Sequence, residues 1–395
     1  MTAVGRVAAA LIALLLAGSC SGAATPGPSG EGSGSPAVTS ASPGSPTPVP
    51  TPAATASSSV VPTPGPTRTP EPTAPPAPTA RWSELAPGDP RPVARQGHTW
   101  TLDAAGGVAY LFGGRDGDRS FDDLWTYDLG ADAWTRLEPA GDGPPARFGH
   151  AAAWVDGVGL VVFAGQAGSR FFNDLWAYDP GAGAWSRLPS RGDRPVPRYG
   201  SCAALGPDGR LWISHGFTED GTRFADTRSY DFVEGRWIDE TPTGQRPVER
   251  CLHGCFWSAD GRFVLFAGQT TGVEALDDLW ALTVGGGEVP SRWERLRGTL
   301  PPARNLFGLA RQAERVIVFG GGGKPRGTYL ADAWLLDALT LEAAPIAEGD
   351  RAPSARRAGA LIDDPAHGRL LLFGGEAEPG LLDDLWALAT PETSG

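Results

Sequence analysis

The chain has 395 residues, a formal net charge of −12 and no run of basic residues. Cationic contacts with phosphates dominate nucleic-acid binding, so this composition argues against a nucleic-acid partner. The 55 glycines and 14 tryptophans are typical of turn-rich β structure with aromatic packing, and the length suffices for one large closed architecture or two ordinary domains.

The N-terminus predicts export. Arg6 precedes an apolar run of ten residues, Val7–Leu16, which is too short to span a bilayer as a mature helix. The following small residues and Cys20 resemble the lipobox of bacterial lipoproteins. That resemblance implies a signal peptide at residues 1–19 and lipidation of Cys20, which would hold the protein on the extracytoplasmic face of a membrane. An ordinary signal peptide cleaved nearby is the alternative.

Residues 20–80 predict a disordered linker. They are almost entirely Pro, Ser, Thr, Ala and Gly, and such a segment has too little apolar surface to offset the entropy of ordering it. The prolines favour extended polyproline II conformations. We interpret the segment as a stalk that lifts a folded head away from a membrane, with a passive linker as the alternative.

Two residue columns recur six times at a near-constant interval. The first is the arginine of a P-x-x-R motif, whose members lie 51 to 54 residues apart: Arg95, Arg147, Arg198, Arg250, Arg304 and Arg356. The second is an aspartate, mostly within Asp-Leu-Trp, at matching intervals: Asp123, Asp174, Asp226, Asp278, Asp332 and Asp384. A fixed period of about 50 residues indicates one supersecondary unit repeated along the chain.

The first repeat contains four short segments that are rich in β-branched or aromatic residues and bounded by Gly, Asp or Pro. They predict strands at Gly97–Leu102, Val108–Phe112, Asp123–Tyr127 and Ala133–Leu137. Asp103–Gly107 predicts a hairpin turn between the first two. Four antiparallel strands per repeat are typical of one blade of a β-propeller.

The last repeat stops after its third predicted strand, so its fourth strand is missing at the C-terminus. Arg81–Leu85, which precedes the first P-x-x-R, matches the fourth strand Ala133–Leu137 of repeat one. We therefore expect Arg81–Leu85 to be the outer strand of the last blade. Such closure removes the open edge that a linear array of blades leaves exposed.

The repeats resemble the kelch family. Phe112-Gly113-Gly114, Asp123-Leu124-Trp125-Thr126-Tyr127-Asp128 and the distant Trp134 match its pattern almost completely. Repeat three departs most, with Arg228 in place of the third-strand tryptophan, and repeat four has an insertion around Gly285-Gly286-Gly287. The resemblance implies an all-β, six-bladed propeller, similar to the central domain of galactose oxidase.

The predicted propeller occupies residues 81–390, after the signal peptide and the linker, and residues 391–395 form a tail. The closing strand lies at residues 81–85. The six blades begin near residues 92, 144, 195, 247, 301 and 353.

The invariant arginine column has two interpretations. A guanidinium repeated in every blade can be structural, bonding carbonyls or a carboxylate between blades. Alternatively, the six arginines form a cationic ring at one mouth of the channel and bind an acidic ligand. Phe148 and Tyr199 follow two of them and could stack on such a ligand. If the column is structural, the variable loops around Arg115, Arg170, Phe217 and Arg326 are the next candidates.

Two groups of residues could bind metals, but each has a simpler interpretation. His98, His150 and His253 share one position of the repeat, and we expect each to be hydrogen-bonded within its own blade. The aspartate column is expected to satisfy turn amides. Asp116, Asp118 and Asp122 lack the other ligand positions of a calcium loop, so we expect a solvated acidic loop. No metal or cofactor is therefore predicted.

Three cysteines lie in the predicted propeller: Cys202, Cys251 and Cys255. Cys251 and Cys255 are too far apart along one strand to pair with each other. Cys202 could pair with either one if the protein is exported, and buried free cysteines are the alternative.

Kelch propellers include enzymes, peptide binders and sugar binders. We find no nucleophile elbow, zinc pattern or phosphate-binding glycine loop, and so no catalytic residue. The leading hypothesis is a lipid-anchored, non-enzymatic binding module at the cell envelope, with a monomeric head and a glycan or acidic peptide at one propeller mouth. The alternatives are a carbohydrate-active enzyme similar to the kelch-type sialic acid mutarotase or to galactose oxidase, and a scaffold of an envelope complex.

Overall fold

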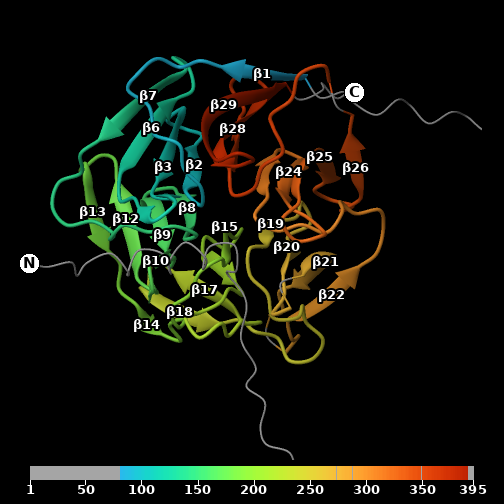
Figure 1. Ribbon diagram of the computed structural model, residues 1–395. Coiled ribbons are helices and arrows are strands. Elements are labelled where there is room, and N and C mark those ends of the chain that lie inside the picture. Colours follow the sequence, from blue (N-terminus) through green and yellow to red (C-terminus); the bar gives the residue numbers. More distant parts are fainter. Residues whose placement is uncertain (1–80, 273, 287, 348, 390–395) are drawn as a thin grey trace, which may run out of the picture. The chain divides into compact units, whose positions relative to one another are not determined.

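The computed structural model describes residues 81–272, 274–286, 288–347 and 349–389. These residues form strands and turns and no helix, so none of their segments is a helix that could span a membrane. Six antiparallel sheets follow one another around a common centre (Figure 1). The predicted six-bladed, all-β propeller is confirmed.

Each blade has four main strands, which in blades 1 to 5 run in chain order from the centre outward. Blade 1 contains β2 (Thr99–Asp103), β3 (Val108–Phe112), β6 (Leu124–Asp128) and β7 (Ala133–Leu137). Blade 2 contains β8 (Ala151–Val155), β9 (Gly159–Phe163), β12 (Leu175–Asp179) and β13 (Ala184–Arg187). Blade 3 contains β15 (Cys202–Leu205), β16 (Leu211–Ser214), β17 (Thr227–Asp231) and β18 (Arg236–Asp239), with β14 (Arg191–Gly192) parallel to β18.

The second and third strands of the last three blades are longer. Blade 4 contains β19 (Gly254–Trp257), β20 (Phe263–Gln269), β21 (Ala275–Thr283) and β22 (Arg292–Leu296). Blade 5 contains β23 (Gly308–Gln312), β24 (Arg315–Gly322), β25 (Tyr329–Asp337) and β26 (Ala343–Ile346). Blade 6 contains β27 (Ala360–Asp364), β28 (Arg369–Glu376), β29 (Leu381–Ala389) and β1 (Arg81–Leu85).

Short hairpins extend blades 1 and 2 where blades 4 to 6 have continuous strands. They are formed by β4 (Arg115–Asp116) with β5 (Arg119–Ser120), and by β10 (Gln166–Ala167) with β11 (Arg170–Phe171). Blade 3 has only an isolated bridge, Phe217 with Arg223, at the same place. The loops between the second and third strands therefore differ between the two halves of the ring.

The first strand of the chain closes the ring, as predicted. β1 pairs antiparallel with β29, in a register that runs from Arg81 with Ala389 to Leu85 with Leu385 (Figure 1). Trp82 is 7% exposed and belongs to a core cluster that joins blades 5 and 6. Blade 6 is thus assembled from the two ends of the described chain.

Aromatic contacts between neighbouring blades explain two conserved positions of the repeat. The fourth-strand tryptophan packs on the phenylalanine of the Phe-Gly-Gly segment in the preceding blade. The ring centroids are 4.8 to 5.2 Å apart in four such pairs: Trp82–Phe319, Trp134–Phe373, Trp185–Phe112 and Trp237–Phe163. Where blade 3 has Ser214 in place of phenylalanine, Trp293 of blade 4 instead contacts Phe263 of its own blade.

The second glycine of the Gly-Gly pair is required in every blade. Its φ lies between +93° and +112° in all six: Gly114, Gly165, Gly216, Gly268, Gly321 and Gly375. A Cβ on Gly114 would lie 3.0 Å from the Gln96 carbonyl oxygen and 2.9 Å from the His98 Cβ. The first position has φ near +60° and accepts Ala164, His215 and Ala267, so only the second position is restricted to glycine.

The inner strand of blade 1 begins later than predicted. β2 starts at Thr99 rather than Gly97, because Gly97 has a φ of +65° and donates its N–H to Ala358 of blade 6. β3 and β7 have the predicted bounds.

One of the two cysteine pairings left open by the sequence is formed. Cys202 of blade 3 and Cys255 of blade 4 form a disulfide, and Cys251 is buried and not part of a disulfide. Cys202 and Cys255 lie in the inner strands β15 and β19, whose alignment at the blade interface brings their Cα atoms to 5.7 Å.

The closing strand should account for a large share of the stability of the head. We expect Trp82→Ala to lower the free energy of unfolding by about 3–5 kcal/mol, because it leaves a cavity against Phe319. Deletion of residues 81–85 should cost more, whereas deletion of residues 21–80 should change stability little. Urea denaturation monitored by tryptophan fluorescence measures all three, with Arg81→Ala as an exposed control. Equal stability of the two deletion variants would show that blade 6 closes in another way.

Candidate functional site

The six arginines of the repeat are buried inside the blades. None is more than 2% exposed. Each guanidinium forms two hydrogen bonds of 2.6–3.1 Å with the aspartate of its own blade. It also donates to the carbonyl two residues earlier and to the first residue of the Gly-Gly pair, as Arg95 does to Val93 and Gly113.

This geometry favours the structural interpretation of the column. A guanidinium whose nitrogens are occupied by its own blade has no free edge to present to a ligand. The predicted cationic ring of Arg95, Arg147, Arg198, Arg250, Arg304 and Arg356 therefore has no exposed guanidinium at the channel mouth. We do not include these six residues in the ligand site that we propose.

The prediction for the aspartate column is wrong. These carboxylates accept hydrogen bonds from the arginines and from the indole of the tryptophan two residues later, as Asp123 does from Trp125 at 2.7 Å. In blade 3, Arg228 replaces that tryptophan and donates to Asp226 through Nε at 3.2 Å. Burial raises the pKa of these carboxyls, but the arginine hydrogen bonds outweigh it and hold the pKa below the usual value in Asp123, Asp174, Asp226 and Asp278.

Directly inside the arginines, a closed cycle of backbone hydrogen bonds surrounds the channel. Each member donates its N–H to the carbonyl of the equivalent residue in the preceding blade, at 2.6–3.1 Å. All have φ between +52° and +67°: Gly97, Gly149, Gly200, Leu252, Leu306 and Ala358. We call this cycle the floor ring. A Cβ on Gly149 would overlap the Tyr199 ring, so glycine there lets Tyr199 lie over the floor.

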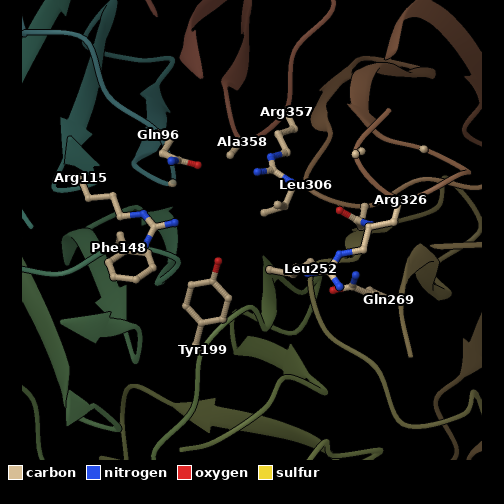
Figure 2. Close-up of a pocket in the computed structure, with 15 residues that line it drawn as sticks. Gln96, Arg115, Phe148, Tyr199, Leu252, Gln269, Leu306, Arg326, Arg357 and Ala358 are labelled. Carbon is tan, nitrogen blue, oxygen red and sulfur yellow. The ribbon is translucent and has the colours of Figure 1, made fainter. Parts of the chain in front are cut away.

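A pocket opens above the floor ring, at the end of the channel nearest the arginine column (Figure 2). Its cavity volume is about 60 Å³, which would hold roughly four to six water molecules. Its walls come mainly from the residue after each arginine and from the segments after Gly-Gly: Gln96, Phe148, Tyr199, Asn305 and Arg357 from the first group, and Arg115, Gln269 and Arg326 from the second.

The structure thus places Phe148 and Tyr199 in the pocket wall, although the arginines before them lie outside it. The two rings contact each other with centroids 5.4 Å apart, and Tyr199 contacts Phe217 at 5.0 Å. With Phe171, which contacts Phe217, they form an aromatic side of the mouth in blades 2 and 3. The opposite side, in blades 4 to 6, is polar.

Arg115 is the pocket residue whose buried side chain has, within the described part of the chain, an unsatisfied hydrogen-bond donor. Its side chain is 8% exposed, and its guanidinium lies 4.2 Å from the centre of the Phe148 ring. Its buried Nε has no hydrogen-bond acceptor among the described residues, and the guanidinium makes no ion pair with them. Burial holds the pKa of Arg115 below its usual value, yet arginine stays charged. Glu376 and Asp118 act on this guanidinium without forming an ion pair with it. A desolvated cation that lacks an ion-pair partner is costly, so this position favours an anionic ligand group.

The other two pocket arginines are held differently. Arg357 is paired with Glu376, with distances of 2.9 Å from Nε and 2.8 Å from Nη2 to the carboxylate. Arg326 is exposed and comes from the loop between β24 and β25. Figure 2 shows Arg115 and Arg357 directed toward the space above Tyr199, with Arg326 at its edge. The lining contains three arginines and no carboxylate, the reverse of the charge of the whole chain.

Sequence reasoning named Phe148 and Tyr199 as ligand-binding and kept Arg115 and Arg326 only as loop positions. It missed Gln96, Gln269, Asn305 and Arg357. Sequence variation between the repeats could have identified these residues. The residue after each arginine and the residue after each Gly-Gly differ from blade to blade, while their neighbours are constant.

The histidines lie between blades rather than within them, contrary to the prediction. His150 of blade 2 is 2.8 Å from the Thr99 hydroxyl of blade 1, and His98 packs on Phe373 of blade 6. His253 packs on His215 of blade 3. No group of three or more possible metal ligands occurs in the described part of the chain, which includes Asp116, Asp118 and Asp122.

Comparison with known proteins identifies the family. The model of the KLHDC2/KLHL20/DRC7 Kelch-repeats domain matches residues 77–268 and 240–394. The chain therefore belongs to the kelch-repeat family. A solved structure entitled "Structure of YjhT" has a similar fold, with a TM-score of 0.60, 18% identity, and coverage of 77% of this chain and 97% of that one.

Curated relatives resemble the propeller but are much longer proteins. Adagio-like protein 3 of Oryza sativa subsp. japonica is 30% identical over 234 residues, which are 55% of this chain and 36% of that protein. The Leucine-zipper-like transcriptional regulator 1 homolog of Drosophila melanogaster is 27% identical over 281 residues, 66% and 28%. Acyl-CoA-binding domain-containing protein 4 of Arabidopsis thaliana is 36% identical over 120 residues, 30% and 18%. The alignments thus span 18% to 36% of these relatives.

Buried histidines should make the head sensitive to mild acid. Burial, with a smaller effect of Arg95, lowers the pKa of His98 to about 3, and burial holds the pKa of His150, His215 and His253 well below the usual value. Between the unfolded pKa near 6.5 and the folded value, only the unfolded state takes up the proton, so stability falls as the pH falls.

We expect each of these histidines to cost about 1.4 kcal/mol of unfolding free energy at pH 5.5 relative to pH 7.5. Urea denaturation at the two pH values measures the loss, and His98→Phe should make it smaller by about that amount. Asp123, Asp174, Asp226 and Asp278 have lowered pKa values and titrate only in stronger acid. A stability that does not change between pH 7.5 and 5.5 would contradict the burial of neutral imidazoles.

Proposed function

We propose that this protein is an exported, lipid-anchored kelch propeller that binds a carboxylate-bearing glycan or peptide in the pocket above the floor ring. The observation that carries the proposal is Arg115, a buried cation whose Nε has no acceptor among the described residues and which lies within an aromatic-lined cavity. A carboxylate would supply both the counter-charge and the missing acceptors.

The charge distribution supports an acidic ligand. The chain has a net charge of −12, so its surface as a whole repels anions. Three arginines around one cavity create a local exception, and a concave site with low-dielectric walls concentrates such a field. An anionic ligand would therefore be directed to the mouth of the channel.

Two features support export and anchoring. The disulfide between Cys202 and Cys255 fits an oxidising compartment outside the cytosol. The N-terminal sequence up to Cys20 resembles a lipoprotein signal. Arg81, where the described chain begins, pairs with Ala389 at the end of blade 6 remote from Gly375 and the pocket.

Binding should depend on Arg115 and not on the stability of the fold. We expect the full-length protein to bind acidic members of an array that carries acidic glycans, acidic peptides and their neutral counterparts. Arg115→Met should weaken this binding by about tenfold or more, since hydrogen bonds to charged groups contribute about 1.5–3 kcal/mol, and should leave the melting temperature nearly unchanged.

Two matched controls separate binding from folding. Arg170→Met removes an exposed arginine from the equivalent hairpin of blade 2 and should affect neither property. Arg147→Met breaks the buried pair with Asp174 and should cost about 3–5 kcal/mol of stability. Retention by Arg115→Met of full affinity for acidic ligands would rule out the pocket as the site.

Anchoring can be tested through Cys20. We expect the wild-type protein to partition into the detergent phase of membrane extracts and Cys20→Ala to appear in the aqueous phase, because the described residues contain no membrane-spanning helix. Cys251→Ala, in the propeller, should partition as the wild type does. Detergent partitioning of Cys20→Ala equal to the wild type would exclude a lipid on this residue.

A further inference from the structure

At the two paired wall positions of each blade, no backbone N–H group is left for a ligand. The residue after each arginine exchanges two backbone hydrogen bonds with the residue after Gly-Gly of the same blade, as Gln96 does with Arg115 and Asn305 with Gly322. The N–H groups of the floor ring are used within the ring itself. Ligand recognition therefore depends on side chains.

Because these backbone groups are already hydrogen-bonded, a peptide ligand is disfavoured. Extended peptides are recognised largely through their main chain, by donors and acceptors of the protein backbone, as when a strand is added to a sheet edge. Here both wall positions are already paired in all six blades. The polar side chains on the walls carry amides, guanidinium groups and the Tyr199 hydroxyl.

Those amides suit a polyhydroxylated ligand. Gln96, Gln269 and Asn305 line the pocket from three different blades. Each amide offers a donor and an acceptor side by side. Adjacent hydroxyls on a sugar ring are likewise both donors and acceptors, so one amide can bond two of them.

The aromatic side provides the second element of sugar recognition. Phe148 and Tyr199 line the pocket, 6% exposed each, and Phe217 supports Tyr199 from behind. A pyranose ring has one face made of C–H groups, and an aromatic surface buries that face while the hydroxyls at the ring edge remain free for hydrogen bonds. Figure 2 shows Gln96 on the same side of the mouth as Arg115 and Phe148, and Gln269 on the other side of Tyr199.

Arg115 adds a requirement for one carboxylate. Arg357 is already neutralised by Glu376, whereas Arg115 makes no ion pair with a described residue. A single carboxylate placed beside the aromatic side would complete the coordination of Arg115. The floor ring and its Leu252 and Leu306 lie beneath this place. The cavity of about 60 Å³ admits the carboxylate end of one terminal residue, whose ring then lies at the open mouth, rather than a continuous chain.

On the basis of the proposed function, we infer that the ligand is a glycan and that the pocket holds its terminal residue, a pyranose carrying a carboxylate of the uronic-acid type. Arg115, which lies over the Phe148 ring, binds the carboxylate. Tyr199 packs on the C–H face of the sugar ring, and Gln96, Gln269 and Asn305 bond the hydroxyls. The remainder of the glycan leaves through the open side of the mouth.

Isothermal titration calorimetry of the full-length protein tests this assignment. The probes are the methyl glycosides of glucuronic, galacturonic and mannuronic acid, the matching neutral methyl hexosides, and an acidic hexapeptide with a free C-terminal carboxylate. We expect at least one uronoside to bind about 10- to 100-fold more tightly than its neutral counterpart, and the peptide to bind more weakly than that uronoside.

Two variants separate the roles of the residues. Arg115→Met should abolish the preference for the uronoside over the neutral hexoside. Asn305→Leu should weaken both sugars by a similar factor and preserve the preference. Arg170→Met should change neither. The melting temperature of each variant shows whether it is folded, and an unfolded Asn305→Leu would be replaced by Asn305→Ser.

The outcomes distinguish this inference from the proposed function. Arg115-dependent binding of the peptide, with no uronoside bound, would overturn the glycan assignment and leave the carboxylate-binding function in place. Equal affinity for uronosides and neutral hexosides would overturn the role of Arg115. No binding of any probe would overturn both.

Discussion

One arginine per blade joins each blade to the one before it. Its side chain is bound to the aspartate of its own blade, as in the pair of Arg147 with Asp174. Its backbone N–H donates to the preceding blade, at Phe121, and its carbonyl accepts from Gly114 of that blade. Because the contact repeats six times around a closed ring, a buried charge is fully paired at every junction. Its burial leaves no uncompensated ion, which is the condition for such a pair to be tolerated inside a protein.

The same junction explains why the other constant positions are constant. The N–H that meets the arginine carbonyl belongs to the second glycine of each pair, which needs a backbone conformation that a Cβ would prevent. The aspartate also binds an indole or, in blade 3, the guanidinium of Arg228. The repeat pattern is therefore a description of blade–blade contacts rather than of a binding site.

The blade–blade contacts described above form a frame that is nearly the same in all six blades. Ligand binding then depends on positions whose side chains take no part in this frame. The residue immediately after each arginine gives its backbone to the frame and its side chain to the channel mouth, so its identity can change from blade to blade without cost to the fold. Blades 2 and 3 place aromatic residues there, and blades 1, 5 and 6 place Gln96, Asn305 and Arg357. A nearly six-fold frame thus carries a pocket with one apolar and one polar side, which can orient a ligand that a symmetric ring could not.

The sequence by itself determined the number of blades, the strand order and the closing role of Arg81–Leu85, because these follow from periodicity and from pairing rules that act locally. It also pointed to Phe148 and Tyr199, through variation beside a constant column. Only the tertiary structure decided that the six arginines lie inside the blades, that the histidines lie between blades, and that Cys202 pairs with Cys255. It also brought Arg115, Gln269 and Arg357, which are 88 to 242 residues apart in sequence, around one cavity. Sequence spacing gives the blade in which a residue lies; whether its side chain points into the blade or into the channel depends on the twist of the strand and on the contacts of the neighbouring blade.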